Sequence, residues 1–198
     1  VGVGKDPVEA VKWYRKSADQ NDIQAQYALG VFCYQGQGVS KDWIEATKWF
    51  RKAADRGHVQ AQYDLSICYR DGEGVSKDLV EAVKWSRVAA DQGHAPAQSN
   101  LGVYYANGEG VARDPAEAVK WYRKAAEQGD DQAQCNLGGF YVGGKGVPVD
   151  FAEALKWFRK AADQGYAGAQ LNLGRFYEEG VGVAKDPVEA AKWFRRAA

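Results

Sequence analysis

A tryptophan returns every 36 residues along this 198-residue chain, and only Trp43 falls outside the series. The series comprises Trp13, Trp49, Trp85, Trp121, Trp157 and Trp193. A fixed period of this length is typical of repeat proteins, in which one short structural unit stacks on the next. The period therefore predicts the architecture before any local pattern is considered.

Aligning the chain on its tryptophans gives one repeat unit: A-Q-x-x-L-G-x-x-Y-x-x-G-x-G-V-x-x-D-x-x-E-A-x-K-W-x-R-K-A-A. Full copies begin near residues 25, 61, 97, 133 and 169, and a half copy, residues 1–18, precedes them. We expect residues 1–198 to form a single repeat array. We also expect further repeats or domains in the parent protein. Residues 1–18 supply only half a unit, and the last helix lacks a following repeat to cover its apolar side.

Each copy contains signals for two helices. An aspartate stands three residues before a glutamate, which predicts an N-cap followed by a capping box. These aspartates are Asp6, Asp42, Asp78, Asp114, Asp150 and Asp186. A glycine after the tryptophan-bearing helix, such as Gly57, predicts a left-handed C-cap. The six cap positions therefore mark the start of the second helix of each copy.

The first helix of a copy carries fewer charged residues and more small residues than the second helix. Ala25, Leu29 and Phe32 share one face at 100° per residue, and we expect that face to be buried. Glycine at position 30 and its equivalents should let a neighbouring helix approach closely, while one tryptophan per repeat anchors the second helix. No segment has the pattern of a strand. The sequence predicts an all-α fold, an α/α solenoid of helix pairs.

Composition excludes several classes of function. Lys+Arg and Asp+Glu both number 26, so the net charge is +0, which argues against a nucleic-acid or membrane-surface binder. No apolar run approaches the roughly 20 residues that a membrane span needs. Cys33, Cys68 and Cys135 show no paired spacing, so we expect free, mostly buried thiols. Unpaired cysteines slightly favour a cytoplasmic location.

The repeat resembles the Sel1-like repeat family, which is related to the tetratricopeptide repeats. The resemblance is carried in one copy by Leu101-Gly102, the Gly108-x-Gly110-Val111 loop, Asp114 and the Glu117-Ala118-x-Lys120-Trp121 run, and it recurs in every copy. It implies a right-handed α/α superhelix whose first helices line the concave side, and a role as scaffold or adaptor for other proteins. Family members are common in bacteria.

No catalytic, cofactor or metal site is expected. The Gly-x-Gly-Val loops follow a helix and repeat five times, so we interpret them as connectors rather than phosphate-binding turns. His58 and His94 occupy equivalent places before a first helix, where capping or solvent exposure is expected, and they lack clustered ligands for a metal. No nucleophile, base and orienting group stand together, so we predict that the chain is not an enzyme.

The candidate binding residues lie opposite the buried face of the first helices, at positions that vary from copy to copy. One group combines aromatic side chains with a cation, a combination favoured where binding energy concentrates. The second is a ladder of amides, which can donate to and accept from an extended peptide backbone. The residues are Tyr27, Tyr34, Tyr63, Arg70, Asn100, Asn136, Asn172 and Arg175.

We therefore predict a protein-interaction scaffold that binds a segment of another protein, or a peptide, in the concave groove. Solvent-facing aromatic and amide side chains without a ligand would explain the same residues. Two other functions stay open: binding or hydrolysis of a small molecule, because some bacterial relatives are reported to bind β-lactam compounds, and a purely structural spacer within a larger protein.

Overall fold

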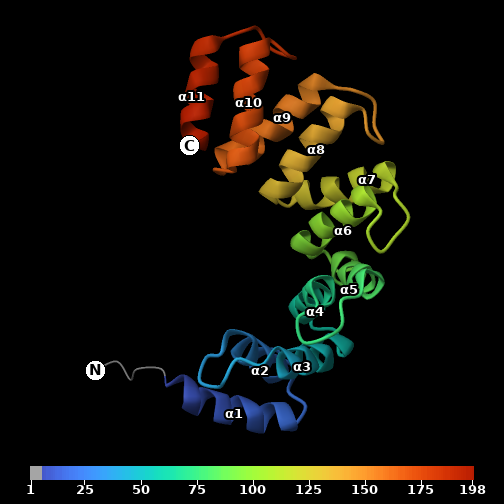
Figure 1. Cartoon of the computed structure of the whole chain (residues 1–198), viewed down its shortest axis with the longest axis vertical. Helices are drawn as coiled ribbons and strands as arrows, with labels where there is room; N and C mark the ends of the chain where they lie inside the picture. Colours follow the sequence, from blue (N-terminus) through green and yellow to red (C-terminus); the bar gives the residue numbers. More distant parts are fainter. Residues whose placement is uncertain (1–5) are drawn as a thin grey trace. The chain divides into compact units, whose positions relative to one another are not determined.

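The computed structural model describes residues 6–198, and within them the chain forms eleven α-helices and no strand (Figure 1). The all-α repeat fold predicted from the sequence is confirmed. The helices are α1 Pro7–Asp19, α2 Ile23–Gln35, α3 Trp43–Asp55, α4 Val59–Asp71, α5 Leu79–Asp91, α6 Ala95–Asn107, α7 Pro115–Glu127, α8 Asp131–Gly143, α9 Phe151–Asp163, α10 Ala167–Glu179 and α11 Pro187–Ala197.

The helices belong to two compact units, one ending at His94 and the other spanning Ala95–Ala198. Within the first unit, α2 packs on α3 and α4 packs on α5, while α1 contacts α2 and α3 contacts α4. Within the second unit, α6, α8 and α10 pack on α7, α9 and α11, and α7 and α9 also contact the helix that follows them. In both units, contact between sequence neighbours gives the stacked arrangement of a helical repeat protein.

The predicted aspartate caps are confirmed at the second helix of every copy. Asp114 is representative, because its Oδ1 accepts hydrogen bonds from the backbone N–H groups of Ala116 and Glu117, each at 3.0 Å. The expected return contact from glutamate to the cap N–H is wrong. The Asp114 N–H already donates to the carbonyl of Tyr105 at 2.9 Å, and the Glu117 carboxylate pairs with Lys120 at 2.8 Å.

Glycine on the first helix makes room for an aromatic ring of the second, as expected. A Cβ added to Gly30 would lie 2.4 Å from Cδ1 of Phe50, far inside van der Waals contact. The same close approach recurs at Gly102 with Tyr122, at Gly138 with Phe158 and at Gly174 with Phe194. The copy formed by α4 and α5 differs at both positions, because Ser66 replaces the glycine and Ser86 replaces the aromatic residue. Both serines are fully buried.

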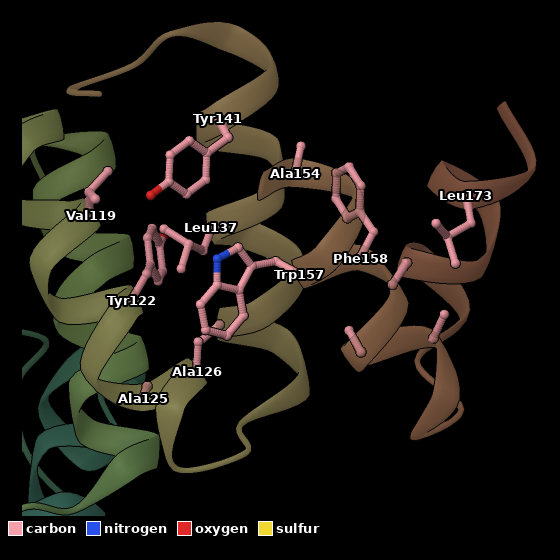
Figure 2. Packing of buried hydrophobic residues seen from close by; sticks show 14 of the residues in the cluster. Val119, Tyr122, Ala125, Ala126, Leu137, Tyr141, Ala154, Trp157, Phe158 and Leu173 are labelled. Carbon is pink, nitrogen blue, oxygen red and sulfur yellow. The ribbon is translucent and has the colours of Figure 1, made fainter. Parts of the chain in front are cut away.

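The tryptophans anchor the core, with one exception. Figure 2 shows the indole of Trp157 reaching from α9 toward Leu137 of α8 and Ala126 of α7, and the side chain is 4% exposed. The equivalent Trp13 is 61% exposed, contrary to the expectation of one anchor per repeat. The indole packs against earlier helices, and α1 is the first helix among residues 6–198.

A buried glutamine follows the first-turn alanine of every first helix, and within each unit such glutamines join successive helices. The Nε2 of Gln62 donates to the carbonyl of Ala54 at the end of α3, at 3.1 Å. Its Oε1 accepts from Nε2 of Gln92, which follows α5, at 2.6 Å. Gln134 repeats both contacts with Ala126 and Gln164. Gln62 and Gln134 therefore each add a side-chain hydrogen bond to a carbonyl in the last turn of the preceding helix, which also accepts from the backbone N–H of Gly57 or Gly129.

The buried face predicted for α2 is confirmed at Ala25 and Leu29 but not at Phe32. Cys33 is fully buried, whereas Phe32 is half-buried and packs against Tyr14 with ring centroids 5.6 Å apart. In later copies a tyrosine stands at this position and its hydroxyl contacts an arginine of the preceding repeat. The small thiol of Cys33 cannot reach that far, and Arg15 instead pairs with Glu45 at 2.8 Å. All three cysteines are free, as predicted.

Candidate functional site

The first unit contains a pocket of about 240 Å³ between α2 and α4, on the side where the binding residues were predicted. Its floor is Phe50 of α3, whose ring is 3% exposed. Tyr27 and Tyr34 stand beside this ring, with centroids 5.9 and 6.3 Å away and planes tilted by 35° and 47°. The close approach of Phe50 to Gly30 places the ring here, so the glycine–aromatic contact of the repeat supplies the floor of an aromatic cup that Tyr27 and Tyr34 complete.

The far wall of the pocket comes from α4 and carries one acid. Asp64 is half-buried; its Oδ1 accepts a hydrogen bond from Nε2 of Gln60 at 3.0 Å, and the Tyr27 hydroxyl also bonds to the carboxylate. Burial raises the pKa of Asp64, and the two hydrogen bonds partly oppose this shift. Burial also raises the pKa of Tyr27, as does the negative charge of Asp64. The ion pairs formed among residues 6–198 do not include Asp64.

The rim of the pocket is fixed by a second acid. The Tyr34 hydroxyl donates to Oε2 of Glu73 at 2.6 Å. This bond and burial raise the pKa of Tyr34 to about 12. The tyrosine therefore stays protonated, and its ring is held in one position over the pocket. Tyr27 is held in a similar way, since its ring stacks on His58 with centroids 4.3 Å apart.

The structure brings together only part of the predicted aromatic cluster. Tyr27 and Tyr34 line the same pocket, but Tyr63 packs against His94 with centroids 4.8 Å apart. The guanidinium of Arg70 forms two hydrogen bonds with the neighbouring carboxylate of Asp71, at 2.8 and 2.9 Å. Tyr63 and Arg70 thus lie on the same helix as Asp64 without lining the pocket.

In the second unit, the three asparagines of the predicted ladder lie on α6, α8 and α10 and are all half-buried. Nδ2 of Asn172 contacts Sγ of Cys135 at 3.7 Å. Nδ2 of Asn100 is buried and has no hydrogen-bond partner among the described residues. Arg175 is exposed. The amides are therefore packed more closely against their neighbours than the sequence suggested.

Asp64 is the residue that the candidate set omitted. Counting by 36, it stands where later copies carry Asn100, Asn136 and Asn172. Its contact with Tyr27 is equivalent to the contact of Asn172 with Cys135. The sequence signal that could have identified Asp64 was its negative charge at a position where later copies carry a neutral asparagine.

The remaining candidates have structural roles. His58 is the N-cap of α4, where its Nδ1 accepts from the Ala61 N–H at 3.1 Å, as expected of a capping residue. Residues 6–198 contain no group of three or more His, Cys, Asp or Glu side chains that could hold a metal ion. None of the helices in this range is long and apolar enough to span a bilayer.

The stacked helix pairs and their repeated caps, glycine–aromatic contacts and buried glutamines define an all-α helical repeat protein. The Sel1 repeat model matches residues 1–22, 23–58, 59–94, 95–130, 131–166 and 167–198. The chain therefore belongs to the Sel1 repeat family. Sel1 repeat proteins are known as protein-interaction scaffolds, and the family is generally non-enzymatic.

Solved structures agree with this assignment. A protective antigen present in uropathogenic Escherichia coli strains is 39% identical, with a TM-score of 0.93 over 98% of this chain and 42% of that protein. This chain thus spans less than half of that relative's length. A Sel1 repeat protein from Oxalobacter formigenes is 37% identical, with a TM-score of 0.88 over 100% of this chain and 79% of that one. A comparison with curated proteins gave no match.

Proposed function

We propose that this chain is a scaffold that binds a segment of a partner protein on the surfaces lined by the first helices of its repeats. The observation that supports the proposal best is the pocket between α2 and α4, with Tyr27 and Tyr34 around Phe50. Tyrosine supplies a large contact area with few rotatable bonds, so little entropy is lost when a ligand covers it. The tyrosines are already held by His58 and Glu73.

The second surface in the proposal is the asparagine ladder of the second unit, together with Arg175. An amide whose Nδ2 contacts only a thiol, as in Asn172, exchanges a weak contact for a stronger one when a peptide carbonyl becomes available. A bound backbone would satisfy a donor that the free protein leaves poorly paired.

The proposal is tested by capturing a partner from a lysate and then measuring the affinity of the purified pair. One variant removes the aromatic surface of the first unit, by changing Tyr27 and Tyr34 to Ala. Another changes Asn100, Asn136 and Asn172 together to Ala. Circular dichroism confirms that each variant is folded.

Two matched controls carry single alanine changes on second helices, Lys48→Ala and Glu127→Ala, at exposed positions outside both surfaces. We expect at least a tenfold loss of affinity for each surface variant, about 1.4 kcal/mol, and no change for the controls. Unchanged binding by both surface variants would place the interaction on the second helices or the loops and would refute the proposal.

A further inference from the structure

The pocket of the first unit combines two features that do not require each other for folding. One is the aromatic cup of Tyr27, Tyr34 and Phe50. The other is the carboxylate of Asp64 in the opposite wall, which is half-buried and receives hydrogen bonds only from neutral groups, Gln60 and Tyr27. A partly desolvated anion without a cation nearby is an unfavourable arrangement in a folded protein.

The surroundings do not neutralise this charge. The basic side chain that acts on the Asp64 carboxylate is His58, and burial lowers the pKa of His58, which favours the neutral ring. The second acid, Glu73, accepts from Tyr34 at the rim and adds further negative charge. Arg70 is already paired with Asp71. The pocket is therefore an electronegative cup with aromatic walls.

Aromatic faces and a carboxylate are the two groups that recognise an organic cation. The face of a ring attracts a cation within about 6 Å of its centre, and this attraction grows when water is excluded. Between the basic side chains, a guanidinium is planar, stacks on aromatic rings and is less strongly hydrated than an ammonium group. Its several N–H donors can also reach both the carboxylate and a neighbouring tyrosine oxygen.

We propose that the pocket between α2 and α4 takes an arginine side chain of the partner segment, with Asp64 as its counter-ion, Tyr27 and Tyr34 as its walls and Phe50 as its floor. This inference rests on the proposed function and specifies the chemistry of the partner. It also explains why an acid stands at the step of the ladder where three later copies carry asparagine. The occupant is a peptide side chain because the pocket opens on the surface that a bound segment would follow.

The test is a selection of random displayed peptides on the full chain, followed by affinity measurements with synthetic peptides. Each selected peptide is also made with citrulline in place of arginine, which keeps the shape and removes the charge. The protein is tested as Asp64→Asn, which installs the residue found in the other copies. Asp55→Asn serves as the matched control, because Asp55 is an exposed acid at the end of α3 outside the pocket.

We expect the selected peptides to share an arginine. Their affinity should fall at least tenfold with citrulline or with Asp64→Asn, and should be unchanged with Asp55→Asn. Recovery of no binder, of peptides that prefer lysine, or of binders that tolerate Asp64→Asn would overturn the inference. Binders without arginine that are lost when the three asparagines are changed would overturn it while supporting the proposed scaffold function, so the two failures are distinguishable.

Discussion

The serine pair of the copy formed by α4 and α5 allows a sharp test of how the repeats pack. In four other copies, a glycine of the first helix faces an aromatic ring of the second, and a Cβ at that glycine would lie 2.3 to 2.7 Å from ring carbons. Ser66 and Ser86 replace both partners and are fully buried. We expect the two replacements to compensate for each other, because the larger residue on α4 is tolerated only where the ring on α5 is absent.

The magnitude follows from this geometry. Ser86→Phe introduces a ring against the Cβ of Ser66, and such overpacking costs about 1–3 kcal/mol. Ser66→Gly alone costs about 1 kcal/mol, because glycine loses more backbone entropy in a helix. With both changes, the ring fits over the glycine as it does at Gly30, and the buried Ser86 hydroxyl, which has no hydrogen-bond partner among the described residues, is removed. The two changes should therefore be coupled by about 1–3 kcal/mol.

The assay is urea unfolding of the full chain, followed by circular dichroism, for the wild type, both single variants and the double variant. The slope of the transition must stay constant for the free energies to be compared, since a changed slope would signal a different unfolding transition. The predicted result is that Ser66→Gly recovers most of the loss caused by Ser86→Phe. If the two effects simply add, Ser66 and Ser86 do not occupy the glycine–aromatic contact and the reasoning fails.

Three further predictions concern the core and the pocket. Trp157→Ala should lower the free energy of unfolding by about 3–5 kcal/mol in urea melts, whereas the exposed Trp13→Ala should cost under about 1 kcal/mol; similar losses would deny the anchoring role. Arg56→Gln should add about 1 kcal/mol, because glutamine at this position would reach the buried and unpartnered Oε1 of Gln26; no gain in the same melts would contradict this. Because burial raises the pKa of Asp64, the folded state holds its proton more tightly than the unfolded chain, and stability falls as the pH rises above about 4. Asp64→Asn should remove this component and be more stable than the wild type near pH 7, and a less stable variant would show that the carboxylate is structural.

The repeat register and the helix limits could be predicted from the sequence because they depend on local chemistry. The Asp114 cap and the left-handed Gly129, with φ of 98°, are set by residues within one turn of the helix end. The exposure of Trp13 could not be predicted from its own copy, because it depends on which helices lie before α1. Local pattern therefore predicts the helices, and contacts between repeats decide their exposed faces.

The candidate site was predictable in its helix face but not in its details. Tyr27 and Tyr34 are seven residues apart on α2, about two helical turns, so their shared direction follows from helical spacing. Arg70 was predicted on the same face, but its guanidinium forms an ion pair with the adjacent Asp71. The burial of Asp64 against Tyr27 joins residues 37 apart in the chain, and this depends on the spacing between α2 and α4. The repeat period alone does not predict the spacing between α2 and α4.

The buried glutamines have a further consequence for a chain built from near-identical copies. Apolar faces that resemble one another can pair in the wrong order or slip by a helical turn at little cost, which is how arrays misfold or exchange repeats between molecules. The Gln62 and Gln134 amides each need one carbonyl before and one amide after, at 2.6 to 3.1 Å. A misplaced neighbour would strand these groups away from water, at about 1–3 kcal/mol for each group left unpaired. Gln62 and Gln134 thus favour the correct neighbouring repeat over a misplaced one, because the correct neighbour satisfies both polar groups of each amide.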